Sequence, residues 1–195
     1  LIALTFSGTK EEIERQELKK RLAILNAIVP ADLYDNDIEH DCTLVTNSEL
    51  LGSSDPQRIF RARLNGQASA AAIEVTAPNG YSGKIKLIVG INHKSTVTGV
   101  RTLKHKETPG LGDKIDLRVS DWILSFTGTS LTNENTGKWH VKKDGGQFDQ
   151  FTGATITPRA VVGAVKNAII YFQQNQDSIF ATANNCESDE TETIE

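Results

Sequence analysis

The sequence predicts a single α+β domain in which helices pack against one antiparallel sheet. Between residues 58 and 103, four strand-like segments follow one another and are separated by turn residues. Segments joined in this way pair as antiparallel neighbours. Apolar residues at helical spacing flank them, before Pro30 and after Pro158, and no linker of the kind that separates domains interrupts the chain. At 195 residues the chain is long enough for one domain with its own core.

Composition narrows the class of protein. A hydrophobic fraction of 38% and a charged fraction of 24% are typical of a globular domain. The net charge of −4 argues against nucleic acid or an anionic membrane face as the main partner. No stretch reaches the roughly 20 apolar residues that span a bilayer. The chain begins Leu-Ile-Ala-Leu-Thr-Phe and contains no Met, so we interpret its start as the end of a removed membrane anchor, with a processed soluble start as the alternative.

The N-terminal part predicts one helix and then a polar loop. Thr9 and Glu12 have the spacing of a capping box, which would open a helix that runs to about Ile28 and stops at Pro30. Its charged side indicates either an ordinary solvated face or a stalk. Residues 31–54 read as irregular and polar, and their acidic residues have no metal-ligand spacing.

The sheet follows. The turn pair Asn65-Gly66 predicts a hairpin, and Gly99 marks a candidate bulge. The four predicted strands cover residues 58–64, 68–77, 84–91 and 96–103. After them, apolar spacing predicts a helix from Ile115 to Phe126 that ends at Gly128, and then a short edge strand over residues 138–141.

Two stretches combine features that suit a ligand. Residues 107–112, Glu-Thr-Pro-Gly-Leu-Gly, form a bare loop where a ligand can lie against backbone. Residues 149–155, Asp-Gln-Phe-Thr-Gly-Ala-Thr, lead directly into the last predicted helix, in which Thr157 is the expected N-cap and Pro158 the first helical residue. We expect this helix to end near Gln174. Thr155 precedes the helix N-terminus, where unpaired N–H groups and the helix dipole favour a phosphate.

These stretches resemble a family of flavoproteins. Asp-Gln-Phe-Thr-Gly-Ala-Thr matches the pattern on which a flavin transferase attaches FMN to threonine, and Glu-Thr-Pro-Gly-Leu-Gly follows a Gly-Tyr-Ser-Gly block as it does in that family. The family comprises the FMN-binding G subunit of the Rnf (Rsx) electron-transport complex and the related C subunit of the Na⁺-translocating NADH:quinone oxidoreductase. The unbroken block from Trp139 to Val162 favours the Rnf type.

The resemblance implies that Thr155 carries FMN through a phosphoester bond. It also implies cofactor contacts from both motifs, namely Asp149, Thr152, Gly153, Ala154, Thr157, Glu107, Thr108, Leu111 and Gly112. The implied protein is an electron-carrier subunit with no independent catalytic activity, anchored once in the inner membrane and facing the periplasm. Its implied partners are the other membrane subunits and, during maturation, the flavin transferase.

Two other functions stay open at this point. The domain could hold FMN or another phosphorylated ligand without a covalent bond, or it could be a stalk domain without a cofactor. Hydrolase chemistry is disfavoured because the four histidines pair with no evident nucleophile, and no Gly-x-Gly-x-x-Gly follows a strand to bind NAD. We expect no metal site.

Cys42 and Cys186 have two interpretations. In a reducing compartment they would be unrelated buried thiols, whereas in an oxidising one they could form a disulfide that fixes the C-terminal segment. We divide the chain into an N-terminal helix at 1–30, an FMN-binding domain at 31–183 and a polar tail at 184–195.

Overall fold

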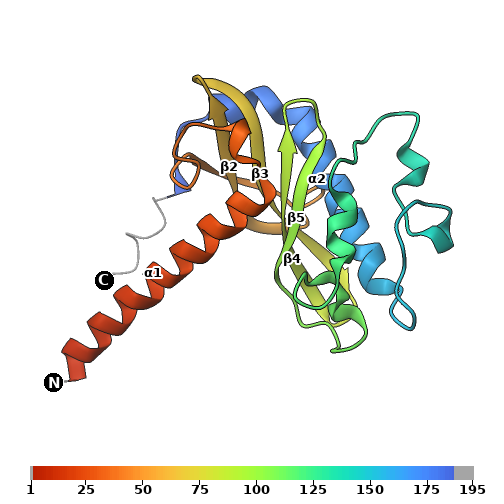
Figure 1. Cartoon of the computed structure of the whole chain (residues 1–195), viewed down its shortest axis with the longest axis horizontal. Helices are drawn as coiled ribbons and strands as arrows, with labels where there is room; N and C mark the ends of the chain where they lie inside the picture. Colours follow the sequence, from red (N-terminus) through yellow and green to blue (C-terminus); the bar gives the residue numbers. More distant parts are fainter. Residues whose placement is uncertain (1, 187–195) are drawn as a thin grey trace.

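A computed structural model describes residues 2–186 and confirms the α+β class. Five antiparallel strands lie side by side in sequence order, and a long helix packs along the sheet (Figure 1). The strands are β1 (Cys42–Asn47), β2 (Ser53–Leu64), β3 (Gln67–Gly80), β4 (Gly83–Asn92) and β5 (Val97–Lys104). The α-helices are α1 (Ile2–Ile28) and α2 (Ile156–Ala181). Five 3₁₀ helices are η1 (Ala31–Leu33), η2 (Gly112–Ile115), η3 (Asp121–Phe126), η4 (Thr136–Lys138) and η5 (Lys142–Asp144).

The four predicted strands are confirmed as β2 to β5. The β2–β3 turn uses Asn65 at φ 52° and Gly66 at φ 76°, the pair of positive angles that a tight hairpin turn requires. The β4–β5 register shifts next to Gly99, between the Gly90–Gly99 and Ile91–Val97 pairs. The edge strand β1 was not predicted, because residues 31–54 read as irregular. Its pairing with β2 places Cys42 opposite Phe60.

Each face of the sheet packs against a different helix. One face packs against α2 and the segments after β5, and its core includes Ile73, Val89, Phe126, Val165 and Phe172. The other face forms a smaller cluster in which Leu25 and Ile28 of α1 meet Phe60 and Ala72 of the sheet. Side chains follow this two-sided pattern because successive strand residues point to opposite faces.

The last turns of α1 contact the sheet. A β-carbon on Gly90 would lie 2.6 Å from the Ile28 carbonyl oxygen, and one on Gly99 would lie 2.9 Å from Ile28 Cα, so these glycines allow α1 to approach. The Thr98 hydroxyl also donates to the Ile28 carbonyl across 2.6 Å. Residues 8–20 are exposed, and α1 projects away from the sheet (Figure 1). Within residues 2–186, no helix has the length and apolar character needed to cross a bilayer.

Three predicted element boundaries in the helices are wrong. The helix α1 already begins at Ile2, so Thr9 lies inside it and does not open it. The helix α2 has Thr155 at its N-cap position instead of Thr157. It also ends at Ala181, about two turns beyond Gln174, because Phe172 and Ile179 continue its buried face.

The segment between β5 and α2 also differs from prediction. Instead of one α-helix from 115 to 126, the chain forms η2 and η3, with Ser120 accepting a hydrogen bond from the Trp122 backbone N–H. Trp122, Ile123 and Phe126 are nevertheless buried, since 3₁₀ and α spacing place them on similar faces. The predicted strand over 138–141 is wrong as well: η4 precedes a single bridge between Val141 and Phe148.

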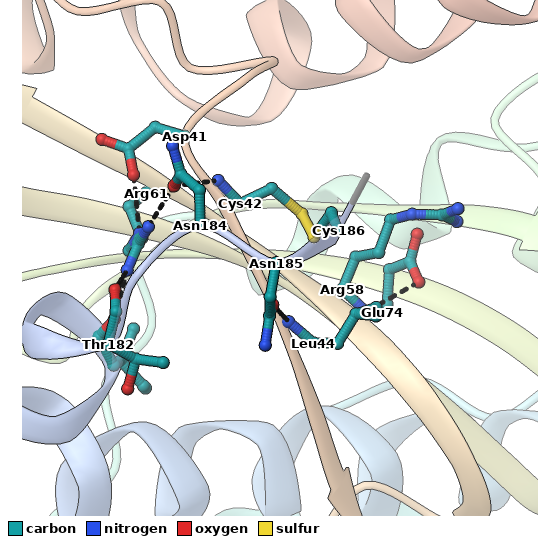
Figure 2. The surroundings of a disulfide bond; sticks show 11 residues. Asp41, Cys42, Leu44, Arg58, Arg61, Glu74, Thr182, Asn184, Asn185 and Cys186 are labelled. Carbon is teal, nitrogen blue, oxygen red and sulfur yellow. Dashed lines mark hydrogen bonds and ion pairs between the residues drawn. A yellow bond between two sulfur atoms is a disulfide. The ribbon is translucent and has the colours of Figure 1, made fainter. Parts of the chain in front are cut away.

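The C-terminal segment is fastened to the edge of the sheet (Figure 2). A disulfide joins Cys42 to Cys186. The side chain of Asn184 accepts from the Cys42 backbone N–H and that of Asn185 from the Leu44 backbone N–H. Residues 184–186, which we assigned to the polar tail, therefore cover part of the free edge of β1. The remainder of that predicted tail, 187–195, lies outside the described residues.

Candidate functional site

Two loops meet at the N-terminus of α2. They are residues 107–112, called here the Pro-Gly loop, and residues 149–155, called the threonine motif. The Thr157 hydroxyl donates to Glu107 Oε2 across 2.5 Å. A β-carbon placed on Gly153 would lie 3.6 Å from Leu111 Cδ2. Segments about forty residues apart in sequence are therefore in direct contact, as a shared ligand site requires.

Thr155 occupies the N-cap position of α2, but its hydroxyl does not accept a hydrogen bond from the first turn of the helix. Its backbone is helical, at φ −79° and ψ −28°, and its side chain makes no cap hydrogen bond. The Thr155 carbonyl accepts from the Arg159 backbone N–H across 3.3 Å, so the helix is already established at this residue. The side chain is half-buried. The hydroxyl thus stands at the positive end of a 26-residue helix.

A tight turn presents the residues before Thr155. The Ala154 backbone N–H donates to the Phe151 carbonyl across 3.2 Å, and Gly153 has φ +78°. A positive φ at this position of a turn is accessible to glycine without strain. Thr152 and Gly153 are exposed and Ala154 is half-buried, so the turn leaves both backbone and a hydroxyl open to a ligand.

The Pro-Gly loop is closed by its own turn. The Leu111 and Asp113 backbone N–H groups both donate to the Thr108 carbonyl, across 3.1 and 3.4 Å. Gly110 has φ +78°, and nothing lies within 4 Å of a β-carbon built on it. Leu111 is 41% exposed, a large fraction for a leucine between two structured loops. This loop therefore offers an apolar side chain and accessible backbone next to Gly153.

Two predicted contacts, Glu107 and Thr157, face inward. Glu107 is 5% exposed and Thr157 is 1% exposed. Besides the bond from Thr157, the Glu107 carboxylate accepts from the Ser82 backbone N–H across 3.2 Å. Gly112 packs against this pair, because a β-carbon there would lie 2.7 Å from Thr157 Oγ1. The Thr157 hydroxyl therefore donates to Glu107 and does not cap the helix.

Asp149 sits at the other end of the threonine motif, exposed to solvent. Lys142 Nζ lies 2.6 Å from Asp149 Oδ1, and the Trp122 indole N–H donates to the Asp149 carbonyl across 2.8 Å. The Trp122 ring also meets the Phe151 ring edge-on, with centroids 5.1 Å apart. These contacts hold the motif against the core from its first residue.

An ion pair links the first turn of α2 to the segment before the threonine motif. The Arg159 guanidinium binds both oxygens of Asp144, at 2.6 and 2.8 Å, and this hydrogen bonding lowers the pKa of Asp144 and raises that of Arg159. Lys114 Nζ lies 6.0 Å from the centroid of the Phe151 ring. Sequence reasoning did not identify Ser82 or Lys114 as site residues, because nothing in their local pattern indicates proximity to the threonine motif.

The residues present suit a flavin nucleotide. The Thr155 hydroxyl and the helix terminus suit its phosphate, and Leu111 with the open Gly110 backbone suits its flat ring. Asp113 Oδ1, directly after the Pro-Gly loop, is buried and has no hydrogen-bond partner among residues 2–186. Thr108 and Thr152 add exposed hydroxyls.

Comparison with known proteins agrees with this geometry. Residues 80–170 match the family model of the FMN-binding domain, a range that contains both motifs. The chain is 60% identical over 188 residues to the G subunit of the ion-translocating oxidoreductase complex of Pseudoalteromonas atlantica, covering 96% of this chain and 87% of the relative. It is 54% identical to the protein of that name from Vibrio cholerae, covering 96% and 89% of the two chains. It is 50% identical to that of Aliivibrio fischeri, covering 96% and 90%.

These identities extend over nearly the whole of each chain. Together with the FMN-binding domain and the antiparallel α+β fold, they decide the family that the two motifs indicated. The chain belongs to the family of FMN-binding G subunits of the Rnf (Rsx) ion-translocating oxidoreductase complexes.

Proposed function

We propose that this chain is an electron-carrier subunit whose FMN is bonded through its phosphate to the Thr155 hydroxyl. The observation that carries the proposal is the state of that hydroxyl: it stands at the N-cap of α2 without a cap hydrogen bond, two residues after Gly153, which lies against Leu111 of the Pro-Gly loop. A threonine used only as a cap would direct its oxygen to a backbone N–H of the first turn. Thr155 does not.

The attachment is a transfer from an activated donor in which the FMN phosphate is joined to a second phosphate, as in a flavin dinucleotide. The Thr155 oxygen bonds to the FMN phosphorus, the P–O bond to the departing nucleoside monophosphate breaks, and the hydroxyl proton is released to solvent. Relative to free FMN and the unmodified chain, the product lacks one water. We assign the activation of this hydroxyl as a nucleophile to a flavin transferase. When bound, FMN supplies reversible uptake and release of electrons.

The protein's own residues then hold and orient the cofactor. The first-turn N–H groups of α2 and the helix dipole stabilise the phosphate charge. Leu111 and the turn at Gly153 would border the ring, and Thr108, Thr152 and Asp113 would supply polar contacts. A covalent tether keeps the cofactor in place in every redox state. This suits a relay between the other membrane subunits of the complex.

We also propose that the domain faces the periplasm and is anchored through a membrane segment preceding the exposed part of α1. The Cys42–Cys186 disulfide supports this location, because such bonds persist in oxidising compartments. Protease digestion of spheroplasts and of inverted vesicles that contain the full-length chain tests it. Digestion in spheroplasts alone is expected, and digestion in inverted vesicles alone would contradict the proposal.

The attachment is tested by intact mass after co-expression with the transferase in the proper compartment. The wild-type mass should exceed the chain mass by one FMN minus water, and denaturing gels should show a fluorescent flavin band. Thr155→Ala should lose both signals, and Thr155→Ser should keep them because its hydroxyl remains. Thr46→Ala, at an exposed threonine of β1 outside both motifs, is the control and should retain the added mass.

Three outcomes would redirect the assignment. Flavin that is released on denaturation indicates a noncovalent FMN module. Retention of the added mass in Thr155→Ala, with its loss in Thr152→Ala, moves the attachment to Thr152. If the wild-type chain is unmodified and colourless although it is made with active transferase, the remaining interpretation is a stalk domain without a cofactor.

A further inference from the structure

We propose that Glu107 is a positioning residue: through Thr157 it fixes the first turn of α2 and thereby keeps the Thr155 hydroxyl on the open side of the site. This inference rests on the proposed role of Thr155. It also changes the part assigned to Glu107, which the family resemblance implies to be a cofactor contact.

Each oxygen of the Glu107 carboxylate accepts a hydrogen bond from the protein. Its Oε2 accepts from Thr157 Oγ1 at 2.5 Å and its Oε1 accepts from the Ser82 backbone N–H at 3.2 Å. Its own backbone N–H donates to His105 Nδ1 across 3.1 Å, which fixes the backbone as well. One side chain thus connects the β3–β4 turn, the segment after β5 and the start of α2.

Glycines enclose this carboxylate. A β-carbon on Gly80 would lie 2.8 Å from Glu107 Oε1, and one on Gly112 would lie 3.0 Å from Oε2. With 5% of Glu107 exposed, no ring-sized ligand reaches the carboxylate without displacing backbone. The geometry therefore favours a structural link over direct contact with the flavin.

Because of helical geometry, the hydrogen bond between Thr157 and Glu107 also determines the direction of the Thr155 side chain. Successive residues of a helix are rotated by about 100°, so side chains two residues apart point to nearly opposite sides. Thr155 has helical backbone angles, and Thr157 is 1% exposed. When the bond to Glu107 draws Thr157 inward, the side chain of Thr155, which is half-buried, is directed away from the buried side of the helix. Ile156, about 100° from each of them, is 48% exposed.

The central variant is Thr157→Val, which keeps the shape of the side chain and removes the hydroxyl. It leaves Glu107 Oε2 buried without its donor, an unfavourable state that a shift of the helix start relieves. Thr157→Ser restores the hydroxyl. The matched control is Thr98→Val, which removes a similar bond to the Ile28 carbonyl far from the site.

Two readouts are measured on the full chain. In the apo protein, amide hydrogen exchange of Arg159, whose N–H bonds to the Thr155 carbonyl, should accelerate about tenfold in Thr157→Val, with mid-α2 amides unchanged. In the attachment reaction, kcat should fall about ten- to a hundredfold with KM for the flavin donor nearly unchanged, because the acceptor oxygen is misplaced. Thr157→Ser should restore both, and Thr98→Val should affect neither.

A second variant keeps the proposal testable if Thr157→Val does not fold. Glu107→Met keeps the length and approximate volume of the side chain but removes both carboxylate oxygens, so it loses the bond from Ser82 and the bond from Thr157. It should accelerate Arg159 exchange and slow attachment in the same direction. Unchanged exchange and unchanged attachment in either folded variant would overturn the positioning role.

Failure of the two proposals can be told apart. If the wild-type chain carries FMN on a residue other than Thr155, the proposed function fails, and the apo exchange data still decide whether Glu107 fixes the helix start. If Thr155 is modified equally well in wild type and Thr157→Val, the proposed function stands and the positioning role is wrong.

Discussion

The guanidinium of Arg61 donates to Asp41 Oδ1 across 2.7 Å, and Arg61 is 2% exposed. The same guanidinium donates to the carbonyls of Ile179 and Thr182 at the end of α2 and to the side chain of Asn184 (Figure 2). Asp41 also binds Arg63 through its other oxygen, at 2.8 Å. A buried cation on β2 therefore joins the segment before β1 to the C-terminal end of α2.

Asp41→Ala should destabilise the domain by about 3–5 kcal/mol, because it leaves the buried Arg61 charge without its anion. Urea unfolding followed by circular dichroism measures the loss. The control is Asp144→Ala, which breaks the exposed pair with Arg159 and should change the unfolding midpoint far less. Equal midpoint shifts in the two variants would contradict the role given to burial.

Reduction of the Cys42–Cys186 disulfide should lower stability by about 5 kcal/mol in the chain-entropy model, since the bond closes a loop with a sequence separation of 144. The comparison is thermal unfolding with and without a phosphine reductant. The Cys42→Ser, Cys186→Ser double variant should unfold like the reduced wild type and be insensitive to reductant. An identical midpoint for oxidised and reduced wild type would rule out this contribution.

Gly112→Ala should cost about 1–3 kcal/mol by overpacking, because its β-carbon would lie 2.7 Å from Thr157 Oγ1. It should also slow flavin attachment by displacing the start of α2. Gly137→Ala is the matched control, since nothing lies within 4 Å of its β-carbon, and its unfolding free energy should stay within about 0.5 kcal/mol of wild type. Wild-type attachment by a folded Gly112→Ala chain would argue against close packing at this contact.

Asp116 should titrate at unusually low pH. Hydrogen bonding from the Arg118 side chain is the main cause that lowers the pKa of Asp116 from 3.8 to about 2. Because the folded pKa lies below the unfolded one, its contribution to stability is complete above about pH 4 and is lost as pH falls through about 2.

Arg118→Ala should raise the pKa of Asp116 toward its ordinary value and remove that pH-dependent contribution. A carboxyl-carbon NMR titration between about pH 1.5 and 5 observes the change directly. Arg159→Ala removes the partner of a different carboxylate, Asp144, and should leave the Asp116 titration unaltered. A titration of Asp116 that is the same in Arg118→Ala and wild type would refute the assigned cause.

The sheet was predictable where the pattern is local. The hairpin at Asn65-Gly66 and the strands β2 to β5 follow from alternation and turn chemistry within about ten residues. The edge strand β1 was not predicted because its six residues are held as a strand by hydrogen bonds to β2 on one side and to Asn184 and Asn185 on the other. These partners are distant in sequence, so the local pattern of residues does not indicate them.

The site was predictable as two motifs but not as a set of contacts. The motifs indicated Thr155 and Leu111 as neighbours of one ligand, and the structure brings their loops together. The function of Thr157 was misread: its position favours an N-cap, but its hydroxyl bonds to Glu107, 50 residues earlier. The prediction of an α-helix over 115–126 was wrong because the spacing of Trp122, Ile123 and Phe126 does not distinguish an α-helix from 3₁₀ turns.

The attachment of α1 by its final turns has a geometric consequence. With Ile28 seated over Gly90 and Gly99, the 27 residues of this helix form a stiff rod about 40 Å long that meets the body of the protein at one end. Inserting a single residue near the middle of the rod would advance the two ends by about 1.5 Å and twist them by about 100°. The length and twist of α1 therefore set the distance and the orientation of Thr155 relative to whatever holds the other end of the helix.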